Sequence, residues 1–447
     1  MRKVLLVFLL LSQLTFSRPT WALDRQPNSD FRQRRQSLAG KANGGAVLLF
    51  ASNEAEGPND LYGYRPDDNF FYLSGWSEPG AALLIVGAAN SNSNDHAYTE
   101  ILFLPNHNPS QEKWTGPKLG ADSPDVSKIT GFDHVEVLDN LRSELVRLLP
   151  LKKATIFTDI VADDEVSNSA VPLDWLKRAN AFPVGVSFQD VRPMLASLRT
   201  TKDAGEIERI RHATDASIAA HFAAMRTVKP GVTEREVSAL MQYEWGKRGC
   251  ERPAYAPIVG SGFYSTVLHY SEDSSTMQSG DLVVIDAAGE YSMYASDITR
   301  TLPVSGKFTA RQREIYDIVL GAQQAAAAAF RSGKSYLRRD RPDSLHDIAY
   351  NYINTHGKDL HGEPLGKYFI HGLGHYVGLN VHDPGDYDAP LGPGAVFTLE
   401  PGIYIPEEKL GVRIEDILYV DQDSKLLNLT GNLPHTADDV ERAMAVK

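Results

Sequence analysis

The fold of this chain is decided by the segment Asp286-Ala-Ala-Gly-Glu-Tyr-Ser-Met-Tyr-Ala-Ser-Asp297. The apolar residues 283–285 lead into Asp286 and predict a buried strand. Residues 297–301 predict a second strand after a turn that contains glycine. The two strands are expected to pair antiparallel, so that both carboxylates can face the same point. Burying two like charges is costly unless a cation or a proton compensates them, and the segment therefore predicts a compensated pair of acids.

Further candidate ligands follow in apolar, strand-like surroundings: His375 in His371-Gly-Leu-Gly-His375, Glu400 in Thr398-Leu-Glu-Pro-Gly, and Glu415 in Val412-Arg-Ile-Glu-Asp416. Four carboxylates and one imidazole exceed the three protein ligands usual for a single catalytic zinc ion. Oxygen ligands with one nitrogen suit Mn²⁺, Co²⁺, Fe²⁺ or Zn²⁺. Two divalent ions would balance four negative charges, and the pattern favours metal-assisted hydrolysis. Each acid taken singly fits a surface or helix-capping carboxylate better, and the apolar, strand-like surroundings of these acids are what argues against that interpretation.

The C-terminal half shows the same order of elements twice. Capping-box pairs predict the starts of three helices, at Asp203 with Glu206, Thr233 with Glu236, and Thr309 with Gln312, the last helix running to Gly333. A further helix is expected over 344–356, and strands over 255–303 and 367–420. The order helix–helix–sheet, repeated, predicts a duplicated half-site with the candidate ligands between two sheets.

The N-terminal half mixes short strands with helices. Strands are predicted at 46–50, 70–73, 81–86, 101–104 and 154–157, because these apolar runs are bounded by turn-forming residues. Helices are predicted from 31 onwards and over 138–149. The whole chain is therefore expected to be α/β (α+β), with an N-terminal domain over residues 24–195 and a catalytic domain over residues 196–447. Spacing shows no catalytic constellation in the first of these domains.

Residues 1–22 differ from the rest. Arg2 and Lys3 precede an almost purely apolar run, 4–14, that is shorter than the roughly 20 residues of a membrane-spanning helix. This pattern is typical of a cleaved secretory signal peptide, with an uncleaved anchor or a buried helix as alternatives. We therefore expect export to a periplasm or the exterior, without stable membrane insertion after cleavage.

Charge and cysteine content exclude several classes of protein. Residues 1–22 carry three basic side chains and no acid, so their removal changes the net charge from −12 to −15. This charge argues against nucleic acid or anionic lipid as a partner. Cys250 is the only cysteine, so neither an intrachain disulfide nor a thiolate metal cluster is possible.

Seven phrases in residues 196–447 resemble the pita-bread peptidases, which include aminopeptidase P, prolidase, methionine aminopeptidase and creatinase. They are Ile258-Val-Gly-Ser-Gly262, Leu268-His-Tyr270, the segment 286–297, His371-Gly-Leu-Gly-His-Tyr-Val-Gly378, Val381-His-Asp383, Leu399-Glu-Pro-Gly-Ile-Tyr404 and Val412-Arg-Ile-Glu-Asp416. In the N-terminal half, Tyr62-Gly-Tyr-Arg65 and Asn69-Phe-Phe-Tyr-Leu-Ser-Gly-Trp-Ser-Glu-Pro79 resemble the creatinase-like α/β domain of aminopeptidase P. The resemblance spans nearly the whole mature chain and implies a pita-bread catalytic domain with pseudo-twofold halves.

The resemblance also implies a role for each candidate residue. Asp286 would bind one metal ion, His375 and Glu400 the other, and Asp297 and Glu415 would bridge the two. Glu400 would also act as a general base. His269 and His382 resemble histidines that contact the substrate and the developing oxyanion. The residues expected near the substrate are His371 beside the proline pocket, Tyr255, Tyr404, Arg413 as an orienter of the carboxylates, and Trp114.

Two departures from the family pattern concern substrate contacts. The segment 383–396 after His382 is short and lacks the arginine that family members often carry there. Near Tyr62, the expected acid aligns with Asn59, although Asp60 is adjacent.

Trp114, in Trp-Thr-Gly-Pro-Lys-Leu-Gly120, resembles a tryptophan that reaches the active site of a neighbouring subunit, which implies a homodimer or homotetramer.

The resemblance favours a metallo-exopeptidase that releases the first residue from peptides with proline at position two. Two divalent ions are implied, with Mn²⁺ as the usual activator and Co²⁺, Zn²⁺ or Fe²⁺ as alternatives. Prolidase, which cleaves Xaa-Pro dipeptides, remains the close alternative. A peptide-binding module without activity and a creatinase-type amidinohydrolase fit less well, because all five candidate metal ligands are present.

Overall fold

The computed structural model describes residues 23–52, 62–87, 98–149, 154–159 and 186–446. The predicted signal segment, and Asn59 and Asp60 beside Tyr62, lie outside these residues. Among the helices that are described, none is long and apolar enough to cross a membrane.

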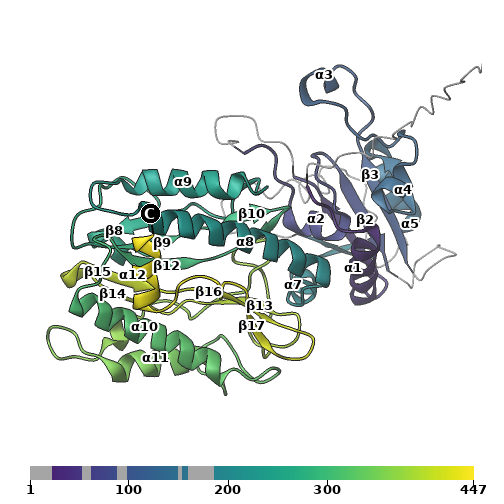
Figure 1. The fold of residues 1–447 in the computed structure, drawn as a ribbon. Coiled ribbons are helices and arrows are strands. Elements are labelled where there is room, and N and C mark those ends of the chain that lie inside the picture. Colours follow the sequence, from purple (N-terminus) through teal and green to yellow (C-terminus); the bar gives the residue numbers. More distant parts are fainter. Residues whose placement is uncertain (1–22, 53–61, 88–97, 150–153, 160–185, 447) are drawn as a thin grey trace, which may run out of the picture.

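A six-stranded mixed sheet forms the core of the N-terminal part (Figure 1), in the order β4-β3-β2-β1-β5-β6. Its strands are β1 (Ala46–Phe50), β2 (Ala82–Val86), β3 (Thr99–Leu104), β4 (His134–Val137), β5 (Thr155–Thr158) and β6 (Ser187–Asp190). The helices are α1 (Asn28–Lys41), α2 (Asp68–Ser74), α3 (Glu112–Thr115), α4 (Val126–Thr130) and α5 (Leu141–Leu148), with the 3₁₀ turn η2 (Leu138–Asn140) before α5. Alternate residues of β1 and β2 belong to two apolar clusters, so both faces of the sheet are covered. Four of the five predicted strands and the helix at 138–149 are confirmed.

The prediction of a strand at 70–73 is wrong, because these residues lie in α2. The Asp67 side chain accepts a hydrogen bond from Phe70 N and caps this helix, and Gly75 ends it with a φ of 61°. All of residues 70–73 are buried. Burial on every side removes the polar positions that would have shown helical periodicity.

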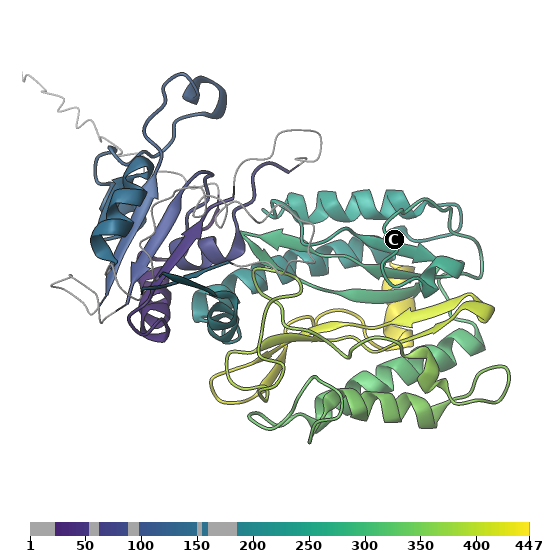
Figure 2. The same ribbon diagram turned by 180° about the vertical axis from the view of Figure 1, so that it is seen from behind.

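The C-terminal part repeats the order of two helices and a set of strands, as predicted. After α7 (Arg192–Arg199), the first half contains α8 (Ala204–Thr227) and α9 (Glu234–Gly246), and the second half contains α10 (Ala310–Ala329) and α11 (Leu345–His356). All three predicted capping boxes are present, although α10 ends before Gly333. Figures 1 and 2 show the two helix pairs on opposite outer sides, with the strands of both halves between them.

The strands between the helix pairs form small antiparallel sheets. Those of the first half are β7 (Arg252–Pro253), β8 (Ile258–Ser261), β9 (Leu282–Asp286), β10 (Gly289–Tyr291), β11 (Tyr294–Ala295) and β12 (Thr299–Pro303), with η3 (Gly262–Thr266) after β8. The second half has β13 (Val396–Leu399), β14 (Gly402–Ile405), β15 (Leu410–Arg413), β16 (Asp416–Val420) and β17 (Leu426–Asn428), with η4 (Leu365–Tyr368), η5 (Pro406–Glu408) and a final helix α12 (Ala437–Ala445). As expected, β9 and β12 pair antiparallel, with Asp286 opposite Thr299.

The prediction of strands from 367 onwards is wrong for the segment 369–395. This segment consists of turns and bends, and the strands of the second half begin only at Val396. Glycine and proline recur through it, and both residues favour turns over regular strand pairing. The irregular backbone carries His371, His375 and His382 towards the strands.

Buried polar contacts hold the segment 369–395 against residues of both parts of the chain. Asp383 accepts from Arg199 Nη2 at 2.6 Å and from Lys202 Nζ at 2.9 Å. Arg65 donates to Leu379 O at 2.8 Å and also binds Glu290. These contacts hold the loop that carries His382 against both parts of the chain.

Candidate metal centre

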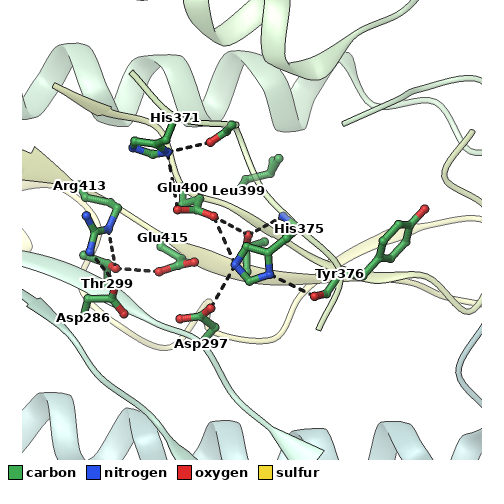
Figure 3. Close-up of polar contacts among 12 residues, drawn as sticks. Asp286, Asp297, Thr299, His371, His375, Tyr376, Leu399, Glu400, Arg413 and Glu415 are labelled. Atoms are coloured by element: carbon green, nitrogen blue, oxygen red, sulfur yellow. Dashed lines mark hydrogen bonds and ion pairs between the residues drawn. The ribbon is translucent and has the colours of Figure 1, made fainter. Parts of the chain in front are cut away.

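The five predicted metal ligands come from segments of both halves, and four of them lie at or just beyond the end of a strand. Asp286 ends β9, Asp297 precedes β12, Glu400 follows β13 and Glu415 lies between β15 and β16. Figure 3 shows the carboxylates of Asp297 and Glu400 directed towards His375, which the irregular segment supplies, while Asp286 lies beside Arg413.

Three of these side chains lie close enough to bind one ion together. Ligand atoms of Asp297, His375 and Glu415 all lie within 4.8 Å of one another. His375 Nε2 is 3.3 Å from Asp297 Oδ2 and 3.4 Å from Glu400 Oε1. His375 Nδ1 donates to Tyr376 O, which leaves Nε2 facing the carboxylates.

Asp286 is held by two partners on the other side of the centre. Arg413 Nη2 donates to its Oδ2 at 2.5 Å, and the Tyr255 hydroxyl donates to its Oδ1 at 2.6 Å. Arg413 also donates to Thr299 Oγ1 and to the Tyr404 hydroxyl. The Tyr404 hydroxyl lies 2.9 Å from His371 Nε2. One arginine from the second half therefore orients a carboxylate of the first.

Two threonines that the sequence analysis did not single out also orient ligands. Thr299 Oγ1 donates to Glu415 Oε2 at 2.7 Å. Thr398 Oγ1 donates to Glu400 Oε1 at 3.2 Å and accepts from His375 N. Each lies two residues from a candidate ligand, Thr299 after Asp297 and Thr398 before Glu400. This closeness in sequence to a candidate ligand is the signal that could have identified them.

Burial and like charges perturb the acids of the centre. Burial and the neighbouring charges of Asp297 and Glu400 raise the pKa of Glu415 well above its ordinary value. Burial, partly offset by His375, raises the pKa of Glu400 to about 7. Burial also raises the pKa of Asp286, and the Arg413 charge opposes this shift. Burial alone would lower the pKa of His375, but the bond to Asp297 and the charge of Glu400 raise it to about 9.

This donor set fits divalent metal ions. Four buried or half-buried carboxylates converge with one imidazole, and Arg413 is the one arginine or lysine among the described residues that line their cavity. Carboxylate oxygens with imidazole nitrogen are a ligand set for Mn²⁺, Zn²⁺, Co²⁺ and Fe²⁺. A divalent ion would relieve the like-charge repulsion that raises the pKa of Glu415 and would displace the proton from His375.

The centre lines a cavity of about 620 Å³. Its walls include the three other predicted histidines, His269, His371 and His382, together with Tyr255. The rings of His375 and His382 lie 4.3 Å apart, edge to face, and burial together with the His375 charge lowers the pKa of His382. Burial and the Arg413 charge lower the pKa of His371 to about 4. His371 and His382 thus offer neutral imidazoles beside the carboxylates.

Trp114 is not among the residues that line this cavity. It lies in the short helix α3, and 89% of its side chain is exposed. Tyr404 does not line the cavity either, but its hydroxyl links Arg413 to His371. Apart from Trp114, every predicted site residue lies in the cavity wall or bonds directly to a residue that does.

Comparisons with known proteins agree with this architecture. Residues 208–422 match the metallopeptidase family M24, and residues 31–157 match the N-terminal domain of aminopeptidase P. The Xaa-Pro aminopeptidases of Haemophilus influenzae and Escherichia coli are 32% and 33% identical to the chain, over 94% and 93% of its length and 97% of theirs. Human Xaa-Pro aminopeptidase 3 is 34% identical over 86% of this chain and 78% of its own.

Solved structures give the same result. Escherichia coli aminopeptidase P with the inhibitor Pro-Leu matches with a TM-score of 0.80 and 31% identity, over 94% of this chain and 98% of that one. Proline aminopeptidase P II from Yersinia pestis matches with a TM-score of 0.80 and 32% identity, over 94% and 100% of the two chains. The chain therefore belongs to the aminopeptidase P family of the M24 metallopeptidases.

Proposed function

We propose that this protein is a Xaa-Pro aminopeptidase, which hydrolyses the first peptide bond of peptides with proline at position two and releases the N-terminal residue. The observation that carries the proposal is the convergence of Asp286, Asp297, His375, Glu400 and Glu415 in one cavity. The family's N-terminal domain, which residues 31–157 match, supports the aminopeptidase over other M24 activities. The Xaa-Pro bond resists general peptidases because proline has no N–H and a fixed φ.

These five side chains would hold two divalent ions, which we propose to be Mn²⁺. Asp297 and Glu415 would be the ligands that the two ions share. When bound, the ions supply an activated water and polarise the scissile carbonyl. Glu400 would take a proton at its carboxylate, because it lies in the cavity beside the other candidate ligands.

The cavity histidines are suited to position the substrate and to stabilise developing charge. His382 stacks edge to face against His375 and can donate towards a carbonyl oxygen held at the centre. His269 lines the same cavity and can donate in the same way. His371 is fixed by its contact with the Tyr404 hydroxyl and by Gly372 O, so its ring can form one wall of a proline pocket.

Comparison of a dipeptide with a tripeptide tests this function against prolidase. The metal-loaded enzyme is offered Ala-Pro and Arg-Pro-Pro in parallel, and kcat/KM is measured for each. The proposal requires efficient cleavage of Arg-Pro-Pro at its first bond. Cleavage confined to Ala-Pro would assign the chain to prolidase instead.

Export and assembly form part of the same proposal. Residues 1–22 support export to a periplasm or the exterior, where the enzyme would act on peptides; an intact N-terminus on protein from the cytoplasm would contradict this. The exposed Trp114 supports a homodimer or homotetramer, because large aromatic side chains are enriched at subunit interfaces. A monomeric mass by light scattering would exclude the assembly.

A further inference from the structure

The strands that present Glu400 and Glu415 are interrupted at these residues. β13 pairs with β16 up to Leu399 opposite Asp416, and β14 pairs with β15 from Gly402 opposite Arg413. Between the two ladders lie residues 400–401 on one side and 414–415 on the other. The backbone bond between these two segments is long, because Ile414 N lies 3.5 Å from Pro401 O. Both carboxylates are therefore attached to backbone outside the regular ladders.

One side chain of α10 spans this interruption. Gln323 donates from Nε2 to Leu399 O at 2.9 Å and to Ile414 O at 3.1 Å. These carbonyls belong to the residues directly before Glu400 and Glu415. Because both partners are acceptors, the amide must present its nitrogen here, and one NH₂ group has the two hydrogens that the two bonds require. Gln323 is 5% exposed, so water competes little for either bond.

The first half has a related arrangement on its own long helix. His221 of α8 is buried and donates from Nε2 to Ala287 O at 3.0 Å, the carbonyl directly after Asp286. Ser217, one turn earlier, accepts from Gly289 N in the same segment. In both halves, a buried polar side chain of the first helix therefore holds backbone that adjoins a candidate metal ligand.

We propose that Gln323 is a positioning residue for the metal centre, which holds together the two backbone segments that present Glu400 and Glu415. The inference rests on the proposed metal-dependent function. Without the amide, the outer ladders and the long Ile414 N–Pro401 O contact are what still join the two segments, so the separation of the two carboxylates is less restricted. Residues that orient metal ligands in this way typically change metal affinity or activity by about 10–100-fold when removed.

Gln323→Met tests the proposal, because methionine keeps the length of the side chain and has no donor. Gln312→Met is the matched control on the same helix. Gln312 is also a buried glutamine and donates to a backbone carbonyl, Gly280 O at 2.8 Å, but it touches no segment that carries a candidate ligand. Both variants lose buried hydrogen bonds and are expected to lower Tm. Only Gln323→Met is expected to weaken metal binding.

Metal affinity is measured by isothermal titration of Mn²⁺ into protein stripped with a chelator, and the spin coupling of the bound ions by electron paramagnetic resonance. For Gln323→Met, we expect affinity for at least one ion to fall by about 10–100-fold and the coupling spectrum to change. Wild-type affinity and spectrum in this variant, or equal losses in Gln312→Met, would overturn the inference. Gln323→Asn, whose amide is too short to reach both carbonyls, must show the same direction of change. Wild-type protein that binds two ions but cleaves no peptide would instead contradict the proposed function.

Discussion

Arg413 Nη2 lies 2.5 Å from Asp286 Oδ2, so an arginine at the end of β15 neutralises a carboxylate at the end of β9. The pair joins the two halves of the catalytic part across the candidate metal site (Figure 3). Both side chains are largely buried, and Arg413 also holds Thr299 and Tyr404. The contact therefore fixes the orientation of Asp286. It also ties β15 of the second half to β9 of the first.

Replacement of Arg413 by methionine should destabilise the metal-free protein strongly. Removing one partner of a buried ion pair leaves an uncompensated charge and typically costs about 3–5 kcal/mol. Urea denaturation in the presence of a chelator measures the loss. Arg313→Met removes exposed pairs with Asp438 and Glu441 and should cost about 0–1 kcal/mol. Equal losses of unfolding free energy in the two variants would show that the Arg413–Asp286 pair contributes no more to stability than the pairs of Arg313.

Asp297→Asn should remove activity through loss of metal. Asp297 belongs to the three residues whose ligand atoms lie within 4.8 Å of one another, and asparagine replaces a charged ligand with a neutral one. Metal content by mass spectrometry should fall by at least one ion per chain, and kcat/KM should fall by about 1,000-fold or more, comparable with the loss of a principal charge-stabilising group. Asp423→Asn, at an exposed acid, is the control and should keep both values. Full metal content in Asp297→Asn would contradict its place in the centre.

Local sequence was sufficient to predict much of this site because its carboxylates follow local rules. Asp286 and Asp297 flank paired strands, and the helix starts at Asp203, Thr233 and Thr309 are marked by side chains that bond within three residues. Such signals depend only on neighbours along the chain.

Other features depend on contacts distant in sequence and could not be predicted. The strand prediction at 70–73 failed because tertiary packing buries every side of α2. Gln323 reads as an ordinary helical residue, since its partners lie 76 and 91 residues away. The backbone path of 369–395 is likewise set by long-range bonds, such as that of Asp383 with Lys202. The loop after His382 is anchored by Asp383, which binds Arg199 at the end of α7 and Lys202 just after it.

Asp383→Asn should loosen the loop that carries His382. Arg199 and Lys202, which bind Asp383, are each 2% exposed, and Arg199 with Lys202 holds the pKa of this buried acid below its ordinary value. Asparagine would leave two buried cations without their counter-ion, at a cost of about 3–5 kcal/mol. Differential scanning fluorimetry should show a lower Tm, and steady-state kinetics a lower kcat. Asp388 lies in the same loop and forms exposed pairs with Arg338 and Arg341. Asp388→Asn should therefore change neither Tm nor kcat. An unchanged Tm in Asp383→Asn would refute the anchoring role.

His221 should make the protein less stable as the pH falls. Burial, with the Arg300 charge, lowers its pKa from 6.5 to about 3. Between these values the unfolded chain binds a proton at His221 and the folded chain does not, so the free energy of unfolding decreases as the pH is lowered. The difference amounts to about 3 kcal/mol between pH 6.5 and pH 4.

His221→Gln removes this contribution and keeps a donor for Ala287 O. Urea denaturation at several pH values, with both proteins free of metal, should therefore give a flatter curve for the variant. Contributions from Glu400 and Glu415 are common to the two proteins and cancel in the comparison. Parallel curves over this range would contradict the neutral, buried state of His221.

Mass spectrometry of the products from Arg-Pro-Pro tests the proposed metal-dependent cleavage of the Xaa-Pro bond. The protein is stripped of metal, and the peptide is added before and after Mn²⁺ is returned. Free arginine and Pro-Pro are expected only after Mn²⁺ is restored, and both products are expected to be lost when EDTA is added. Absence of cleavage with every divalent metal tried, or cleavage that persists in EDTA, would contradict this proposal.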